Sequence, residues 1–437
     1  MTAGFVVAAP RSGAGKTTVA LGLMRAFTRR GLAVQPFKCG PDYIDPAFHR
    51  VATGRPSFNL DGWAMSGNSL GGLVDGHAAD LAIAEGVMGL FDGVGGGVGG
   101  RGATADIAAL LGWPVVLVLD VKGQTETAAA IALGCANYRP DVAIAGVILN
   151  RVASARHLGL ISPAFERVGI RLFGALSNDP RLTLPERHLG LVQAGETIDL
   201  EERLDLLARV LKEQVDLDAL VKSARPAGVG HPASNSAFID PPGQRVALAN
   251  DHAFSFMYPH LLEHWRACGV EIRPFSPLAD EAPAADADAV WLPGGYPELH
   301  AGALASAARF QTGLRVLAGR AVPIHGECGG YMVLGQGLED AEGQRHAMAG
   351  LLALETSFAK RSLHLGYRMA RLDADCALGS AGTTVLGHEF HYASVLSAGD
   401  GALVECRDAS GAVVTEAGAR RGSVSGTFFH AISKATP

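Results

Sequence analysis

The sequence is poor in charge and has no excess of positive charge. Charged residues make up 18% of its 437 residues, against roughly 25% in a typical soluble domain. Lys plus Arg number 37 and Asp plus Glu number 43, which gives a formal net charge of −6. This balance offers no basic surface for a nucleic acid or an anionic membrane, so we expect neither as a partner. The 48% of hydrophobic residues also excludes global disorder.

Cysteine is scarce and scattered, and long apolar runs are missing. The six cysteines lie far apart and form no Cys-x-x-Cys pair, which excludes a disulfide framework and a zinc ribbon and indicates a reducing compartment. Residues 1–9 are apolar but lack the basic segment that opens a signal peptide. No run of about 18 apolar residues follows. We therefore expect a soluble, cytoplasmic protein.

What the sequence does contain is a series of short apolar runs with room for helices between them. This spacing is typical of α/β domains, in which helices cover both faces of a parallel sheet. The runs fall in two series: residues 5–9, 33–37, 81–84, 115–119 and 144–149, then 246–249, 270–275, 289–292 and 322–324. Residues 223–244 hold four prolines and many small polar residues, so they cannot sustain a helix or a central strand. We predict domains at 1–222 and 245–437, joined by a linker at 223–244.

A glycine-rich loop follows the first expected strand and precedes an amphipathic helix expected over residues 19–27. It is a variant of the phosphate-binding pattern G-x-x-x-x-G-K-[ST], with Pro10 in place of the first glycine. In such a loop, backbone N–H groups and the helix N-terminus hold phosphates, Lys16 reaches the terminal phosphates and the Thr17 hydroxyl holds Mg²⁺. An ordinary glycine-rich turn is the alternative. The predicted nucleotide-binding residues are Ser12, Gly13, Ala14, Gly15, Lys16, Thr17 and Thr18.

Acidic side chains follow the next expected strands, at the sheet edge where parallel sheets bind ligands. They are Asp42, Asp45, Glu85 and Asp92. A single acidic residue at such a position is typical of a solvated loop. Four acidic residues beside a phosphate loop favour a site for a nucleotide and its metal ion. Asn150 ends a later strand, where its amide suits recognition of adenine; a helix N-cap is an equal alternative.

A second constellation surrounds Cys328. The sequence HGECGG (325–330) joins an expected strand to an apolar run at 331–334, which is the pattern of a nucleophile elbow with sulfur in place of oxygen. We expect the helix N-terminus behind Cys328 to lower the pKa of the thiol. A buried structural cysteine is the alternative, and it fits the other five cysteines better.

His430 is the candidate proton acceptor for this thiol, because such partners meet only in the fold; a structural histidine is the alternative. Gly295, in a tight turn after another expected strand, and Gly329 are expected to supply the N–H groups of an oxyanion hole. The sequence HEFH (388–391) superficially resembles a metal motif. Residues three apart on an extended segment point to opposite faces, so we do not expect His388 and His391 to share a metal.

Several stretches together resemble the cobyrinic acid a,c-diamide synthases over almost the whole chain. They are APRSGAGKTT, KCGPDYIDPAFH, AEGVMGLFDG, LPERHLGL, LPGGYPELH, GECGGYMVLG and GHEFHYAS. LVQAGE and SPLADEAP are similar to the branch that acts on hydrogenobyrinic acid, the cobalt-free substrate. The resemblance implies an N-terminal P-loop amidoligase domain similar to dethiobiotin synthetase and a C-terminal class I glutamine amidotransferase domain.

The resemblance also implies an activity and roles for individual residues. The activity is the ATP- and glutamine-dependent amidation of the a- and c-carboxylates of hydrogenobyrinic or cobyrinic acid, through an acyl phosphate. Many class I amidotransferases carry a Glu two residues after the His, and this chain has Ile432 there, so a third triad member is missing from its usual place. The implied roles are Cys328 as nucleophile, His430 as base, Lys16 and Thr17 on MgATP, Asp45 and Glu85 on the metal, Asp42 and Asp92 at the acyl phosphate, and Tyr43 and Ile44 facing the corrinoid carboxylate.

Three alternatives stay open at this point. Cobyric acid synthase and nickel-sirohydrochlorin a,c-diamide synthase share the architecture but act on other tetrapyrroles. A partitioning-type P-loop ATPase would carry a Lys five positions before the loop lysine, where this chain has Arg11, and would lack a nucleophile elbow. A stand-alone glutaminase would leave residues 1–222 without a task. The expected partners are small molecules, namely a corrinoid carboxylate, ATP and glutamine, and the oligomeric state is open, with a homodimer as one alternative.

Overall fold

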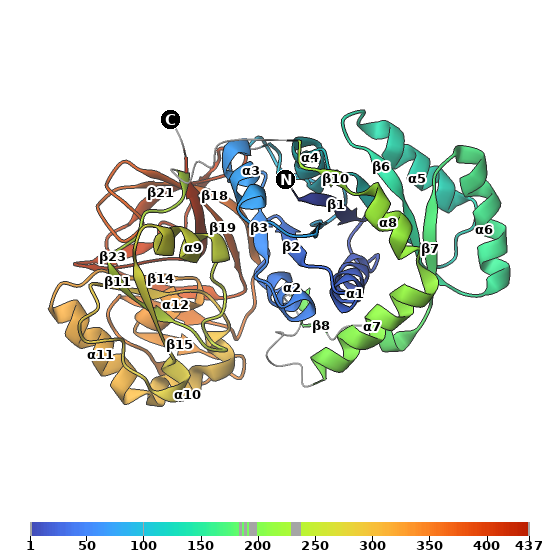
Figure 1. The fold of residues 1–437 in the computed structure, drawn as a ribbon. Helices are drawn as coiled ribbons and strands as arrows, with labels where there is room; N and C mark the ends of the chain where they lie inside the picture. Colours follow the sequence, from blue (N-terminus) through green and yellow to red (C-terminus); the bar gives the residue numbers. More distant parts are fainter. Residues whose placement is uncertain are drawn as a thin grey trace. The chain divides into compact units, whose positions relative to one another are not determined.

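The chain divides into two compact units, Met1–Asn235 and Ser236–Pro437, which run from blue to green and from yellow to red in Figure 1. The structure is a computed structural model. It describes residues 2–98, 100–182, 199–228 and 237–435, together with the backbone of 186–187 and 190–191. Residues 184–185, 188–189 and 192–196 of the sequence stretches named above, and 229–236 of the expected linker, lie outside the described residues.

Seven parallel strands form the central sheet of the first unit. Their order is β3-β2-β4-β1-β5-β6-β7, and β10 pairs antiparallel with the start of β1. All residues of β2 and β4 are buried, as expected for strands that are covered on both faces. The predicted parallel sheet is therefore confirmed. The strands are β1 (Ala3–Ala8), β2 (Val34–Cys39), β3 (Phe58–Leu60), β4 (Leu81–Glu85), β5 (Val115–Asp120), β6 (Ile144–Val152), β7 (Leu172–Ser177) and β10 (Arg225–Pro226).

Helices connect these strands and cover the sheet. The helix predicted over 19–27 is longer, because it begins at Lys16 within the phosphate loop. This helix is α1 (Lys16–Arg29). It packs against α7 (Leu200–Gln214). Arg25 donates to Asp205 Oδ1 at 2.7 Å, and this partly buried ion pair links the two helices. The other helices of the unit are α2 (Asp45–Thr53), α3 (Gly67–Asp75), α4 (Thr104–Leu111), α5 (Thr127–Tyr138), α6 (Ala155–Val168) and α8 (Leu217–Ser223), and β8 (Glu186–Arg187) pairs with β9 (Gly190–Leu191).

The second unit contains a smaller parallel sheet with the order β12-β11-β13-β14-β24, to which β23 adds antiparallel. Its first four strands match the second predicted series. The strands are β11 (Arg245–Ala249), β12 (Glu271–Phe275), β13 (Ala289–Leu292), β14 (Ile324–Glu327), β23 (Ala419–Arg421) and β24 (Val424–Thr427), and the helices are α9 (Pro259–Ala267), α10 (Ala301–Ser306), α11 (Ala308–Gly319) and α12 (Gly329–Leu334).

Two further sheets complete this unit, and the sequence reading did not predict them. One has the order β16-β15-β17-β20 and the other, which is antiparallel, β22-β21-β18-β19-β25. The chain passes from the parallel sheet into the antiparallel one at Phe428, between β24 and β25, and this places His430 in β25 opposite His388. The strands are β15 (Gly337–Glu339), β16 (Arg345–Ala347), β17 (Leu354–Ser357), β18 (His364–Leu372), β19 (Thr384–His391), β20 (Ser394–Ala398), β21 (Val404–Asp408), β22 (Val413–Val414) and β25 (Phe429–Lys434).

All six cysteines are free thiols, and all lie in the described part of the chain. Among the described residues, no helix combines the length and the apolarity that a crossing of the bilayer would need.

Candidate active sites

The phosphate loop lies between β1 and α1 in a conformation that depends on its glycines. Gly13 and Gly15 have φ of 74° and 89°, values that favour glycine over other residues. A Cβ at Gly15 would lie 2.1 Å from Nδ2 of Asn150. That amide donates to the carbonyl oxygen of Ala14 at 2.9 Å, so Asn150 holds the loop. The N-cap alternative for Asn150 is wrong, because Ser154 caps the next helix.

A cavity of about 330 Å³ runs along the loop. Six of the seven predicted loop residues line it, and Ala14 is buried behind them. Asp42, Asp45 and Asn150 also line it, together with Lys38 and Arg151. Lys16 donates through Nζ to the carbonyl oxygen of Met88 at 3.0 Å. The structure therefore brings most of the predicted nucleotide-binding residues to one cavity.

Three of the four predicted acidic residues, Asp42, Asp45 and Glu85, form a cluster around the buried ammonium group of Lys38. Lys38 Nζ forms an ion pair with Asp45 and lies 3.2 Å from Glu85 Oε1 and 3.6 Å from Asp42 Oδ2. The Thr17 hydroxyl donates to Glu85 Oε1 at 2.6 Å. Parallel strands bring these groups together, because β4 lies between β2 and β1, and β1 leads into the phosphate loop and α1.

The charges in this cluster shift the pKa values of its members. Burial disfavours the ammonium form of Lys38, but Asp45, Glu85 and Asp42 outweigh burial and raise the pKa of Lys38. Burial would raise the pKa of Glu85, but Lys38 and His49 lower it below its ordinary range. Burial and the neighbouring Asp42 raise the pKa of Asp45. Burial, followed by the charge of Lys38, lowers the pKa of Lys16.

Two residues of this cluster were given no role from the sequence. Lys38 is 3% exposed in the fully buried strand β2, and His49 is completely buried in α2. His49 Nε2 lies 2.8 Å from Glu85 Oε2, and its Nδ1 lies 3.0 Å from the Ser57 hydroxyl. For Lys38 the signal available in the sequence was a lysine directly after the expected strand at 33–37, because a charge that becomes buried there needs a partner.

The remaining predicted residues of this unit lie in different surroundings. Asp92 is exposed, is absent from the cavity lining, and accepts from the backbone N–H of Gly89 at 3.0 Å. Asp42 accepts from the N–H of Ile44 at 2.8 Å and so fixes the turn into α2. Tyr43 is half-buried and Ile44 buried in that turn.

In the second unit, Cys328 lies in the tight turn between β14 and α12. Its φ of 47° is unusual for a residue other than glycine, and such strain is typical of nucleophile elbows. The turn is compact and leaves no room for a side chain at Gly330, since a Cβ there would lie 2.0 Å from the carbonyl oxygen of Leu292. The N–H of Cys328 donates to Thr427 in the neighbouring strand at 2.7 Å. The predicted strand–turn–helix arrangement around Cys328 is present.

His430 lies next to Cys328 across Gly294. A Cβ built on Gly294 would lie 2.2 Å from Cε1 and 2.7 Å from Nε2 of His430, and 3.2 Å from Cβ of Cys328. One small space therefore borders both the imidazole and the cysteine. Gly294 had no predicted role, although it directly precedes Gly295 in the LPGGY turn.

The two glycines predicted for the oxyanion hole are adjacent. A Cβ at Gly329 would lie 3.1 Å from the backbone nitrogen of Gly295. The N–H of Gly329 donates to the sulfur of Cys328. The two backbone N–H groups are therefore neighbours beside Cys328, and their role as an oxyanion hole stays a prediction.

The predicted lowering of the Cys328 pKa is wrong. Burial, followed by the charge of Glu298, raises the pKa of this thiol, and the N–H of Gly329 compensates only in part. The short helix α12 does not overcome desolvation of the thiolate. Burial also lowers the pKa of His430 to about 3. At neutral pH the pair is therefore a thiol and a neutral imidazole.

Glu327 is the acidic residue beside His430 in this site. Its Oε2 lies 3.8 Å from Nδ1 of His430, and its Oε1 accepts from the N–H of Ala431 at 2.8 Å. Glu327 is 1% exposed, and burial raises its pKa to about 8. It directly precedes Cys328 in the chain, whereas many class I amidotransferases carry this acid two residues after the histidine. Ile432, at that position, is fully buried.

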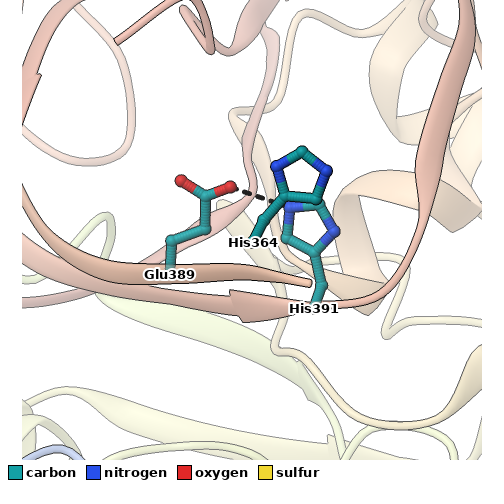
Figure 2. Close-up of side chains that lie close together, drawn as sticks. All are labelled: His364, Glu389 and His391. Carbon is teal, nitrogen blue, oxygen red and sulfur yellow. Dashed lines mark hydrogen bonds and ion pairs between the residues drawn. The ribbon is translucent and has the colours of Figure 1, made fainter. Parts of the chain in front are cut away.

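His388 and His391 lie on opposite faces of β19, as predicted. His388 pairs with His430 in β25 and His391 pairs with His364 in β18. Figure 2 shows that His391 instead lies with Glu389 and His364.

The comparisons with known proteins cover nearly the whole chain. Residues 5–192 match the family model of the CobQ/CobB/MinD/ParA nucleotide binding domain, and residues 245–437 match that of the CobB/CobQ-like glutamine amidotransferase domain. Two similar relatives are each named hydrogenobyrinate a,c-diamide synthase. The one from Rhodobacter capsulatus is 57% identical over 98% of both chains, and the one from Mesorhizobium japonicum is 54% identical over 99% of both.

Similarity to solved structures is much weaker. The septum site-determining protein MinD of Pyrococcus horikoshii, solved with Mg-ADP, is 16% identical and has a TM-score of 0.32, over 51% of this chain and 94% of that chain. A similarity of this size assigns neither a function nor a partner to this chain.

Proposed function

This chain belongs to the cobyrinic acid a,c-diamide synthase family, and we propose that it amidates the a- and c-carboxylates of hydrogenobyrinic acid with ATP and glutamine. The observation that supports the proposal is that one chain carries two different candidate sites. One is a phosphate loop facing a carboxylate cluster, and the other is a thiol beside a neutral imidazole.

Cys328 and His430 release ammonia from glutamine. The imidazole of His430 accepts the thiol proton while the sulfur attacks the side-chain amide carbon of glutamine. The N–H groups of Gly295 and Gly329 stabilise the negative charge on the amide oxygen, and one such donor contributes roughly 3 to 4 kcal/mol. His430 then returns the proton to the departing nitrogen, and water hydrolyses the thioester to glutamate. Because His430 has a low pKa, it is neutral and can act as the base at physiological pH.

The phosphate loop activates the corrinoid carboxylate. The terminal phosphoryl group of ATP passes to a carboxylate oxygen, which gives ADP and an acyl phosphate. Such transfers need positioning and charge neutralisation more than covalent help from the protein. Lys16 and the loop N–H groups neutralise the phosphates. Ammonia then attacks the acyl carbon, and phosphate leaves as the amide forms.

The residues at this edge of the sheet fit Mg²⁺. They present oxygen donors, which Mg²⁺ prefers, and the cluster holds three carboxylates around Lys38. Thr17, Asp45 and Glu85 would hold the ion, and Thr17 and Glu85 are already in contact at 2.6 Å. When bound, Mg²⁺ neutralises charge on the phosphates of ATP. Asp42 lines the same cavity and would lie near the acyl phosphate, with Tyr43 and Ile44 in the adjoining turn as candidates for contact with the corrinoid.

The substrate is tested by mass spectrometry of the products formed from hydrogenobyrinic and cobyrinic acids, offered side by side with ATP and glutamine. We expect the mass change of two amides on hydrogenobyrinic acid and a smaller yield on the cobalt-containing acid. The matched control is Lys16→Ala, which should form no product with glutamine or with ammonium salts. Amidation of cobyrinic acid alone would overturn the choice of branch, and amidation of neither acid would overturn the proposed activity.

A further inference from the structure

We propose that His364, Glu389 and His391 form a binding site for a divalent transition-metal ion such as Zn²⁺, distinct from the magnesium site of the phosphate loop. The proposal does not depend on the substrate of the enzyme. Each of the three side chains offers one ligand atom, and these atoms lie within 4.8 Å of one another (Figure 2).

The strand register builds this cluster. His364 in β18 pairs directly with His391 in β19, and Glu389 precedes His391 by two residues, so all three project from one face of the sheet. Gly366 lies opposite Glu389 and leaves room for the guanidinium of Arg368, whose Nη1 would lie 3.0 Å from a Cβ at Gly366. The two antiparallel strands therefore fix the backbone positions of all three groups.

The donor set selects the class of ion. Two imidazole nitrogens and one carboxylate oxygen are a common set for Zn²⁺ and for Co²⁺ or Fe²⁺, whereas Mg²⁺ and Ca²⁺ prefer oxygen alone. Three protein ligands also leave a coordination position for water or another small molecule. The carboxylate cluster of the first unit has no such imidazole pair; there His49 accompanies only oxygen donors and Lys38.

The geometry needs only a small adjustment to hold an ion. Two ligand atoms on one tetrahedral Zn²⁺ lie about 3.3 Å apart, and His391 Nε2 is already 2.8 Å from Glu389 Oε1. Glu389 and His391 are buried, whereas His364 is exposed and free to approach. Its ring is stacked on that of His391, with centroids 4.7 Å apart.

Neighbouring groups orient the ligands, as outer partners do in metal sites. Arg368 donates to Glu389 Oε2 at 2.6 Å and leaves Oε1 directed toward His391. Phe428 packs on the other face of the His391 ring at 4.2 Å. The Nδ1 atom of His391 is buried and has no hydrogen-bond partner among the described residues, so within that part of the chain Nε2, beside Glu389, is the ring nitrogen that the protein orients.

The test is a titration of the full-length protein with Co²⁺, followed by displacement with Zn²⁺, in excess Mg²⁺ so that the carboxylate cluster is occupied. The Cys328→Ala protein is used, since a free active-site thiol would also bind these ions. We expect one equivalent of Co²⁺ with visible absorption bands of a low-coordinate ion, and displacement by one equivalent of Zn²⁺. The midpoint of thermal unfolding should rise on binding.

In the same background, His364→Ala should weaken Co²⁺ binding at least about 10-fold without lowering the metal-free midpoint, because His364 is exposed. His346→Ala is the matched control, since His346 instead pairs with Asp340 at 2.7 Å, and it should bind like the parent. Retention of full affinity by His364→Ala, or absence of a stoichiometric spectrum in the parent, would overturn the proposal. Glu389→Gln offers a second variant of nearly unchanged shape, and it should weaken binding as well.

Discussion

The acid–base chemistry of the glutaminase site is governed by burial of single residues. The thiol of Cys328 has a raised pKa and the imidazole of His430 a lowered one, and burial is the largest cause of both. A resting enzyme of this kind holds neutral partners and ionises the sulfur only as the proton moves to His430. Glu327, beside His430 Nδ1, is the residue best placed to orient the imidazole in the absence of an acid at 432.

Gly294 is expected to be essential for glutamine use but not for amidation itself. Replacement by Ala would place a methyl group 2.2 Å from His430 Cε1, so the imidazole must move away from Cys328. A displacement of about 1 Å can cost 10²-fold in rate, and we expect a loss of about that size in glutamine-dependent synthesis, with ammonium-dependent synthesis retained. Parallel assays with the two nitrogen donors measure this. Gly302→Ala, whose nearest neighbour would be 3.8 Å away, is the control, and equal activity of Gly294→Ala and this control would refute the role.

Glu327 should make the stability of the protein fall as pH rises. Its pKa is about 8 in the folded chain, raised from 4.5, so between about pH 5 and pH 8 the folded state holds a proton that the unfolded state has lost. Stability then falls by about 1.4 kcal/mol per pH unit for this group. Glu327→Gln cannot exchange this proton. The thermal midpoint of the variant minus that of the wild type should therefore increase from pH 5 to pH 8. A difference that stays constant across this range would contradict the assignment.

At the scale of elements, the sequence predicted the parallel sheets but not the antiparallel ones. The strands β1 and β5 can be recognised in the sequence as continuous apolar runs, because both faces of the sheet are buried there. In β18, buried and exposed residues alternate and charged side chains intervene, so the strand carries no comparable run. The same limit hid the partnership of His364 and His391, which depends on strand register that no local pattern encodes.

The sequence located some residues of the two sites and missed others, again because a local pattern does not encode contacts between distant segments. The phosphate loop and the elbow are local turns, and the residues around Lys16 and Cys328 were found from contiguous sequence. Lys38 and Glu327 were missed because their roles depend on burial and on neighbours from other strands. The roles of Asp92 and of Tyr43 stay predictions.

The elbow between β14 and α12 should tolerate no side chain at Gly330. A Cβ there would lie 2.0 Å from the carbonyl oxygen of Leu292, and such a clash with backbone typically costs 1 to 3 kcal/mol, so about that loss is expected for Gly330→Ala. Gly319, at the end of α11, has open space around its Cβ position, and Gly319→Ala should be neutral or stabilise by about 0.5 to 1 kcal/mol. Chemical denaturation of both variants measures the contrast; equal stability would show that the turn relaxes easily.

At the scale of the whole molecule, two units with different chemistry share one chain. An acyl phosphate is prone to hydrolysis, so the amidation needs ammonia to arrive while water is excluded. Ammonia in neutral solution is mostly protonated and is then not a nucleophile. A chain that carries both the glutaminase and the phosphate loop can release neutral ammonia and consume it within one enzyme.

The most direct measurement of this account follows nitrogen from glutamine into the product. Wild-type enzyme is given hydrogenobyrinic acid, ATP and glutamine labelled with ¹⁵N in the side-chain amide, and the product mass and released ADP are recorded. The account predicts two ¹⁵N atoms per diamide from the wild type, with ADP formed alongside. Cys328→Ala should incorporate no ¹⁵N but still form the diamide from ammonium salts. Unlabelled diamide from the wild type, or ¹⁵N incorporation by Cys328→Ala, would contradict the account.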